Sequence, residues 1–348
     1  MPSSKKTSTA PPRRARATGR VTLADVARAA GVSPITVSRA LRGERAVAAD
    51  LVERVQAAVA ELGYVPDPAA RALASSHSSH VAVLIPKLAN IVFVELLDVL
   101  QRSLMAAGYQ MLIGVTHYDA AEEEAVLRSV LAHRPAGLIL TGAERSPGAA
   151  ALVEGSGVPC VHVMDLAPGP GRYSVGFSQR DAGQALTQRL LDAGRRQVAY
   201  VAAQLDPRTL QRGEGYEAAL RQAGLGDRVR KVLVAEPSSM ALGGELLARV
   251  LQEAPQTDAI FFCNDDLAQG ALLAALRLGV KVPERVAVVG FNDLPGSEQM
   301  VPPLTTVATP RAEMGEQAAR MLLTLMRGQA VEHPCLDLGF QIVGRASG

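Results

Sequence analysis

The stretch that decides the fold of the first part of the chain is Val21–Gly43, "VTLADVARAAGVSPITVSRALRG", in which two short helical patterns flank one glycine. Thr22 is a residue type that caps helices, and apolar positions at helical spacing follow it. Gly31 stands just past the last of them, where the backbone must turn left-handed and only glycine does so without steric cost. The stretch therefore predicts a first helix that begins after Thr22 and ends at Gly31.

The second half of the stretch predicts a helix that contacts DNA. Ser33 is placed to cap this helix, and Pro34 falls in its first turn, where a missing N–H costs nothing. Helical spacing turns Val37 and Leu41 inward. The outward set is Ile35, Thr36, Ser38 and Arg39. Two short helices that cross closely at a glycine are typical of a helix-turn-helix, whose second helix lies in the major groove, while an ordinary αα-corner is the alternative.

A third helix, predicted from about Ala48 to Leu62, completes a three-helix unit over residues 20–66. Residues 67–79 are predicted as a hinge helix and linker, because "PAARALA" offers only two helical turns and a Ser/His run follows it. Leu73 in this segment is suited to wedge into a minor groove or, alternatively, to pack on the core. Thr22 and Arg71 are further candidate contacts to DNA.

The charge of the chain is concentrated at its beginning. Residues 1–80 hold 12 Lys or Arg against 6 Asp or Glu, a balance of +6, whereas the other 268 residues carry −4. A basic head on a mildly acidic body indicates that the head meets a polyanion. Residues 1–19 form a basic tail that is predicted to be disordered, either as a solubilising arm or as a weak, non-specific contact to DNA phosphates.

Other features of the sequence bound the class of protein. The three cysteines are odd in number and far apart, which favours a reducing compartment over a disulfide framework or a Cys-x-x-Cys metal site. The first 20 residues lack an apolar core region, and no run of about 18 apolar residues occurs. We therefore expect a cytoplasmic protein with no membrane partner, no metal and no cofactor.

From Val81 onward the chain alternates between apolar runs and helical patterns. The runs read as strands are "VAVLIP", "YQMLIGV", "GLILTG", "PCVHVM", "VAYVAA", "VRKVLVAE", "AIFFCND" and "VAVVGFND". Near-continuous apolar strands that alternate with helices indicate parallel sheets covered on both faces, a doubly wound α/β body. The series is too long for one sheet, so two lobes are predicted.

Polar side chains follow the carboxyl ends of several of these strands, where ligands bind in such sheets. Amides and carboxylates pair with hydroxyls, and a guanidinium grips a carboxylate or phosphate, so the set suits a polyhydroxy acid. Helix capping is the commoner role of any single Asp or Asn, and we expect it of Asp265 and Asp266. The candidate effector residues are Asn90, Phe93, Asp165, Arg208, Arg212, Asn264 and Asn292.

Three separate stretches resemble the lactose-repressor (LacI) family of bacterial transcription regulators, in the order the family has them, over residues 20–348. They are "TLADVARAAGVSPITVSRALRG", "LGYVPDPAARALA" and "VPPLTTVATPRAEMGEQAARMLL". The resemblance implies a recognition helix that carries Ser33, Pro34, Ile35, Ser38 and Arg39, with Leu73 as the minor-groove lever. Departures from the family pattern are Pro34, Ile35, Asp67 and Asn292.

The same resemblance implies a periplasmic-binding-protein-like body. Its first lobe would comprise residues 80–177 and 309–330, and its second lobe residues 178–308 and 331–348. Positions matching Asp165, Arg212, Asn264 and Asn292 would bind the effector.

Within the family, "LDPRTLQRGEGYEAAL", "CNDDLAQGA", "GFND" and "LDLGF" are most similar to gluconate-operon repressors. This implies a homodimer on a palindromic double-stranded operator, released by gluconate or 6-phosphogluconate. A sugar-binding transport protein of the same two-lobe fold is the alternative hypothesis. An enzyme is disfavoured because no catalytic constellation is visible.

Overall fold

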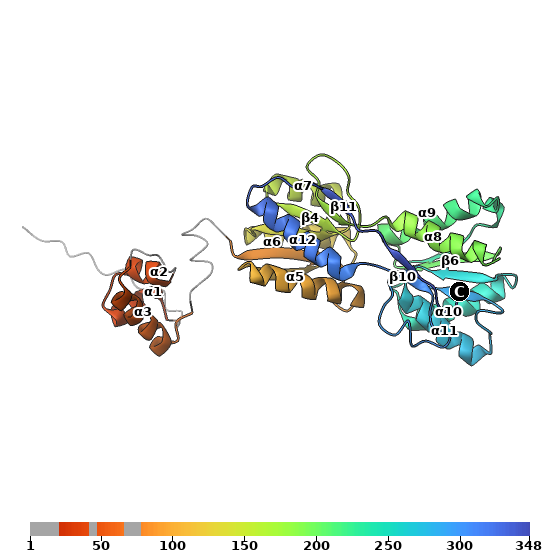
Figure 1. Cartoon of the computed structure of the whole chain (residues 1–348), viewed down its shortest axis with the longest axis horizontal. Coiled ribbons are helices and arrows are strands. Elements are labelled where there is room, and N and C mark those ends of the chain that lie inside the picture. Colours follow the sequence, from red (N-terminus) through yellow and green to blue (C-terminus); the bar gives the residue numbers. More distant parts are fainter. Residues whose placement is uncertain (1–20, 42–46, 66–77) are drawn as a thin grey trace, which may run out of the picture. The chain divides into compact units, whose positions relative to one another are not determined.

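The computed structural model describes residues 21–41, 47–65 and 78–348, and the chain divides into two units, residues 1–77 and 78–348 (Figure 1). The predicted basic tail, and the predicted hinge and linker up to residue 77, lie outside the described residues. We call the first unit the head and the second the body, and each is described by itself.

The head contains three helices, α1 (Leu23–Ala30), α2 (Pro34–Leu41) and α3 (Ala49–Leu62). Thr22 caps α1, and Asp25 completes a reciprocal capping box, since its carboxylate accepts the backbone N–H of Thr22 at 2.9 Å. Gly31 ends α1 with φ 66°, as predicted. The helices enclose the fully buried Val26, Val37 and Val55 with small alanines between them. The predicted helix-turn-helix fold is thus confirmed.

The first sheet of the body has six parallel strands in the order β11-β5-β4-β3-β1-β2. Alternate residues of β1 face opposite sides, so Val81 and Val83 join one core and Ala82 and Leu84 another. Helices α5 and α12 cover the first side and α6 and α7 the second (Figure 1). The strands are β1 (His80–Ile85), β2 (Gln110–Val115), β3 (Gly137–Thr141), β4 (Cys160–Val163), β5 (Ser174–Gly176) and β11 (Cys335–Asp337). The helices are the 3-10 turn η1 (Ile91–Phe93), α5 (Val94–Ala106), α6 (Ala120–Ala132), α7 (Pro147–Ser156) and α12 (Arg311–Met326).

The second sheet is also parallel, in the order β7-β6-β8-β9, with α8 packed on α9 and α10 packed on α11. Its central strands β6 and β8 are buried along their whole length, which is why they read as unbroken apolar runs. The strands are β6 (Val198–Ala203), β7 (Arg230–Val234), β8 (Ala259–Phe262) and β9 (Ala287–Val289). The helices are α8 (Gln179–Asp192), α9 (Pro207–Gln222), the 3-10 turn η2 (Gly226–Arg228), α10 (Met240–Glu253) and α11 (Asp265–Leu278).

Two short strands, β10 (Thr306–Ala308) and β12 (Gln341–Val343), pair antiparallel with each other. Parallel bridges from Val289 to Thr305 and from Asn292 to Ala308 join β10 to the second sheet. The expectation that residues 331–348 belong wholly to the second lobe is wrong for β11. This strand pairs with β5 of the first sheet, because the chain runs along that sheet's edge before it returns to β10.

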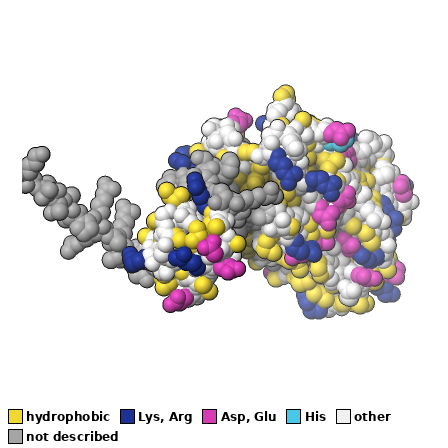
Figure 2. Space-filling model, turned by 60° about the vertical axis from the view of Figure 1, so that its left-hand side comes forward, with side chains coloured by type: hydrophobic (Ala, Val, Ile, Leu, Met, Phe, Trp, Pro, Cys, Tyr) yellow, Lys and Arg dark blue, Asp and Glu magenta, His cyan; other side chains and the backbone are white. Residues whose placement is uncertain are grey.

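The predicted α/β class is confirmed, and all eight apolar runs contain a strand. The three-residue strands β5, β10, β11 and β12 were not among them, because so few residues carry no periodic signal. Acidic and basic side chains intersperse on the visible face of the body (Figure 2). Within the described residues, none of the helices has the length and apolar character needed to cross a membrane.

Candidate functional site

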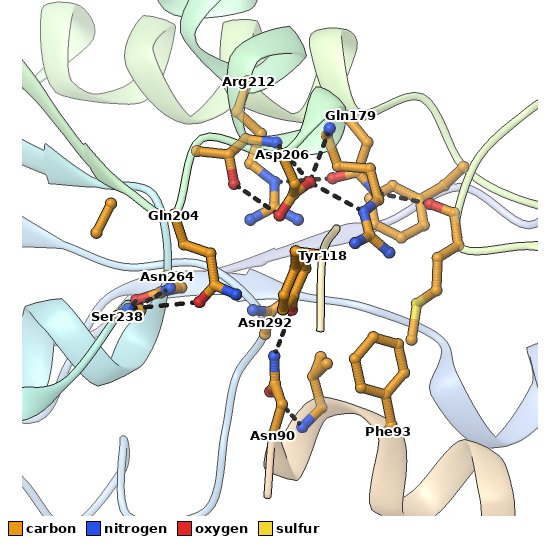
Figure 3. Close-up of a pocket in the computed structure, with 16 residues that line it drawn as sticks. Asn90, Phe93, Tyr118, Gln179, Gln204, Asp206, Arg212, Ser238, Asn264 and Asn292 are labelled. Carbon is orange, nitrogen blue, oxygen red and sulfur yellow. Dashed lines mark hydrogen bonds and ion pairs between the residues drawn. The ribbon is translucent and has the colours of Figure 1, made fainter. Parts of the chain in front are cut away.

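A pocket lies in the body where the carboxyl ends of the two sheets face each other (Figure 3). Each part of its lining follows a strand, as expected for ligand sites in parallel sheets. The first sheet supplies Asn90, Val92, Phe93, Tyr118, Met164, Phe177 and Gln179. The second sheet supplies Ala203, Gln204, Asp206, Arg208, Thr209, Arg212, Ser238, Asn264 and Asn292.

Two buried guanidiniums, one turn of α9 apart, form the cationic side of the pocket. The Nε of Arg208 donates to Asp206 at 3.2 Å. Asp206 also caps α9, because its carboxylate accepts the backbone N–H of Arg208 at 3.0 Å and that of Thr209 at 3.3 Å. Burial acts to raise the pKa of Asp206, but the charges of the two arginines and the hydrogen bonds outweigh it and hold that pKa below its ordinary value. Asp206 is therefore an anion at neutral pH.

Arg212 is fixed from three directions. Its Nε donates to Gln179 Oε1 at 2.8 Å, and its Nη1 donates to the carbonyl of Cys263 at 2.6 Å. Its guanidinium lies 3.8 Å from the ring centroid of Phe291, a cation–π contact. Burial lowers the pKa of Arg212 from its ordinary value, yet a guanidinium stays protonated in proteins at neutral pH. A rigid, positively charged group is thus aimed at the pocket before any ligand arrives.

Amides and hydroxyls make up the other polar parts of the lining. Asn264 caps α11 through the N–H of Leu267, at 3.1 Å, and its Nδ2 donates to Ser238 Oγ at 2.8 Å. Asn90 caps the η1 turn and donates from Nδ2 to the Tyr118 hydroxyl at 3.1 Å. Burial raises the pKa of Tyr118, so its hydroxyl keeps its proton. These groups both donate and accept hydrogen bonds, as sugar hydroxyls require.

Strained backbone gathers at this pocket. Non-glycine residues seldom adopt positive φ, and tertiary structure must hold them there. Of the seven such residues in the described ranges, four line the pocket, namely Tyr118, Met164, Gln204 and Asn292. Asn292 has φ 109° and is held by its N–H to the carbonyl of Val307 at 2.8 Å and by Arg311, which donates to the Asn292 carbonyl. Such a concentration of positive φ is typical of functional sites, which makes this pocket the candidate site.

Six of the seven predicted effector residues meet in this pocket, and Asp165 does not line it. Asp165 is buried next to the lining: its carboxylate accepts the N–H of Leu166 at 2.9 Å, and the charge of Arg208 acts on it. The expectation that Asp265 and Asp266 cap α11 is wrong, because Asn264 is the cap. Asp265 instead turns to a loop after β9 and accepts the N–H of Leu294 at 2.7 Å.

Several lining residues were missed by the sequence reasoning. Tyr118, Asp206 and Ser238 all follow a predicted strand, so the strand-end rule applied to every strand would have found them. Gln179 was missed because it follows β5, which carried no signal. Among the described residues, no group of His, Cys, Asp and Glu is arranged to hold a metal ion.

The predicted DNA-contacting residues of the described head lie on α2 and its cap, apart from Thr22, which caps α1. The Oγ of Ser33 accepts the N–H of Thr36 at 3.1 Å, so Ser33 begins α2 as predicted. Ile35 is 65% exposed and Arg39 is exposed, while Thr36 and Ser38 are half-buried. Thr22 and Pro34 are also exposed. Arg71 and Leu73 lie outside the described residues.

Comparison with known protein families gives one match in the head and one in the body. Residues 22–67 match the family model "Bacterial regulatory proteins, lacI family", and residues 187–347 match "Periplasmic binding protein-like domain". The HTH-type transcriptional regulator GntR of Pseudomonas aeruginosa is 55% identical over 332 residues, which span 95% of this chain and 97% of that protein.

Two crystal structures show the same likeness. That of transcription regulator GntR from Chromobacterium violaceum is 48% identical with a TM-score of 0.75, covering 77% of this chain and 98% of that one. That of the lac repressor dimer, bound to operator and the anti-inducer ONPF, is 27% identical with a TM-score of 0.82 and covers 94% and 99%.

A helix-turn-helix head joined to a two-lobe body with a polar pocket defines a ligand-responsive, DNA-binding transcriptional regulator. The chain belongs to the LacI family of bacterial regulatory proteins, and within it the GntR regulators are among its most similar relatives. Regulators of this family bind operator DNA and small-molecule effectors. The alternative hypothesis of a transport protein fails, because the head matches a family of DNA-binding regulators.

Proposed function

We propose that this regulator is a cytoplasmic repressor of sugar-acid utilisation genes and that gluconate or 6-phosphogluconate releases it from its operator. One observation carries the choice of effector: Arg208 and Arg212 face amides and hydroxyls across the pocket. A guanidinium binds a carboxylate or phosphate through paired hydrogen bonds, and amides pair with hydroxyls. The GntR name of its relatives supports the same class.

The contact with DNA is assigned to α2 and its cap. Ile35 and Arg39 offer an apolar surface and a guanidinium of the kinds that contact a thymine methyl group and a guanine edge. Thr22, Ser33, Pro34, Thr36 and Ser38 complete the proposed surface, with Arg71 and Leu73 from the segment outside the described residues.

A homodimer is the proposed assembly, since one small head reads only half of a palindromic site. Two helices of the body present apolar side chains that a second copy would cover. Val94 and Met105 on α5 are 55% and 61% exposed, and Leu276 on α11 is 56% exposed. The lac repressor, to which the chain is similar, was crystallised as a dimer on its operator.

The test is a gel-shift assay with the full chain and the DNA upstream of its own operon, with and without gluconate or 6-phosphogluconate. The expected result is a retarded band at low salt that at least one of the two effectors removes. Glucose serves as the control, because it is a neutral sugar of the same carbon count. A band that none of these ligands changes would contradict the effector class, and no band at all would contradict the operator.

A further inference from the structure

Asp206 is an acidic residue placed where an acidic effector is proposed to bind. Its side chain is only 15% exposed and lines the pocket together with Arg208 and Arg212 (Figure 3). A carboxylate so close to an incoming anion repels it and weakens its binding, so the presence of Asp206 in the pocket needs an explanation. Helix capping alone does not account for it, since Asn and Ser cap equally well without charge.

The net charge of the pocket lining follows from its ionised side chains. Among the lining residues, which all lie in the described body, Arg208, Arg212 and Asp206 are the ionised side chains. Asp206 compensates Arg208, whose Nε lies 3.2 Å from it. Arg212 has neutral hydrogen-bond partners, Gln179 and the carbonyl of Cys263, and feels the charge of Asp206 without a hydrogen bond to it. The lining by itself therefore carries a net charge of one positive unit, and Asp165, buried just outside the lining, is a further carboxylate whose charge acts on Arg208.

We propose that Asp206 is the residue that sets effector charge: it tunes the pocket to a sugar acid with one negative charge and disfavours a second one. This inference rests on the proposed sugar-acid effector and narrows it to the unphosphorylated monocarboxylate. A second carboxylate or a phosphate near α9 meets Asp206 as a like charge beside largely buried side chains, where such repulsion is strong.

The experiment compares gluconate with glucarate by calorimetric titration of the full chain. The two sugar acids have the same carbon chain, and glucarate carries one more carboxylate. The variant is D206N, which keeps the cap and the shape of the side chain and raises the net charge of the pocket by one. 6-Phosphogluconate is the third ligand.

The wild type is expected to prefer gluconate, and D206N is expected to shift the ratio of the two dissociation constants about tenfold or more toward glucarate. One charge at hydrogen-bonding distance changes an ionic equilibrium by about 10- to 1000-fold. The double variant D206N/R208Q restores the original net charge and is expected to move the ratio back.

The control is D258N, which removes an equal charge from the same lobe. Asp258 accepts the backbone N–H groups of Arg196 and Gln197, at 2.8 and 3.0 Å, just before β8, at the end of the strands away from the pocket. In D258N the ratio of the dissociation constants for gluconate and glucarate is expected to stay at the wild-type value. D206S, which also caps without charge, repeats the test if D206N folds poorly.

A purely structural role for Asp206 would change both affinities by the same factor, and that result would overturn the proposal. If the wild type binds neither sugar acid, the effector class proposed above is contradicted separately. The role of Asp206 is then decided by D206N alone: a gain of glucarate binding supports it, and no binding overturns it.

Discussion

Asp265 follows the pocket residue Asn264 in the chain, but its side chain points away from the pocket and holds a neighbouring loop in place. Its carboxylate accepts hydrogen bonds from Thr306 Oγ1 at 2.7 Å, Leu294 N at 2.7 Å and Ser297 Oγ at 3.0 Å. It thereby ties the loop after Asn292 to β10. Gly290 is required here, because a Cβ on it would lie 2.1 Å from Asp265 Oδ1.

Titration of Asp265 gives a prediction on stability. Burial raises the pKa of Asp265 to about 6 from an ordinary 3.8, although its hydrogen bonds act to lower it. The folded chain therefore holds this proton more tightly than the unfolded chain, and the free energy of unfolding falls as pH rises from about 4 to 6. Relative to D265N, which does not titrate, the wild type is expected to lose roughly 3 kcal/mol across this window.

Urea denaturation followed by circular dichroism at several pH values between 4 and 7 measures this difference. A gap between wild type and D265N that does not change with pH would show that the pKa of Asp265 is close to its ordinary value.

A second prediction at this scale concerns Arg39 on the exposed face of α2. Replacement of Arg39 by Ala is expected to weaken operator binding by about 1–3 kcal/mol, as for the loss of one base contact, and to weaken binding to unrelated DNA far less. Fluorescence anisotropy with both duplexes at one fixed salt concentration measures the two losses. Equal losses would mean that Arg39 contacts a phosphate.

At the scale of elements, the head depends on how its short helices end. Gly31 and Gly63 end α1 and α3 with φ 66° and 60°, conformations that cost other residues about 1–2 kcal/mol. The two glycines differ in their surroundings. A Cβ at Gly31 would lie 2.8 Å from Arg54 Nη2, which donates to the carbonyl of Ala30, whereas nothing lies within 4 Å of a Cβ at Gly63.

Replacement of either glycine by Ala should therefore destabilise the head, and G31A should do so by more than G63A. The shared part of the loss is the backbone cost, about 1–2 kcal/mol, and the excess in G31A reports the displaced Arg54 contact. Thermal unfolding of the full chain followed by circular dichroism gives both values. Equal losses would show that the Arg54 side chain moves aside without cost.

At the scale of the whole body, Arg311 connects the two lobes. It is the first residue of α12, and its Nε donates to Glu95 on α5 at 3.0 Å. The same guanidinium donates to the carbonyl of Asn292 in the pocket and to Thr309 Oγ1 at 2.9 Å. Its side chain is 12% exposed. A rotation of one lobe against the other must strain or break this junction.

Replacement of Arg311 by Gln is therefore expected to weaken the link between effector and operator more than it weakens effector binding. The ratio of operator affinities without and with gluconate should fall by about 3- to 30-fold, the usual size for a residue along a coupling network. Anisotropy titrations measure it. E95Q, which removes only the partner on α5, should show part of the same loss. Unchanged ratios in both variants would contradict a coupling role.

Much of the fold followed from local patterns. Eight strands, the three head helices and the end of α1 at Gly31 were predicted because each has a clear period or a cap. The three-residue strands were not, since β5 and β11 are defined by their neighbours in the sheet. For the same reason the assignment of residues 331–348 to one lobe failed at β11.

The site followed from the sequence only in part. Asn90, Arg208 and Asn292 are in the pocket because strand ends gather at one edge of a parallel sheet, which the order of elements already dictates. Asp165 also follows a strand, yet its side chain is buried and is not part of the pocket lining. The direction in which a loop side chain points depends on the φ of its residue. Tyr118, Gln204 and Asn292 have positive φ, which tertiary contacts must hold in place.

The sequence by itself therefore determined the class of protein, its helix-turn-helix head and the α/β body, because periodicity, caps and motif order are local properties. Only the tertiary structure decided that Arg212 donates to Gln179, that Asp265 is turned away from the pocket, and that Arg311 joins the lobes. Those contacts connect residues whose distance depends on how the two sheets and their helices pack, and no local pattern records that packing.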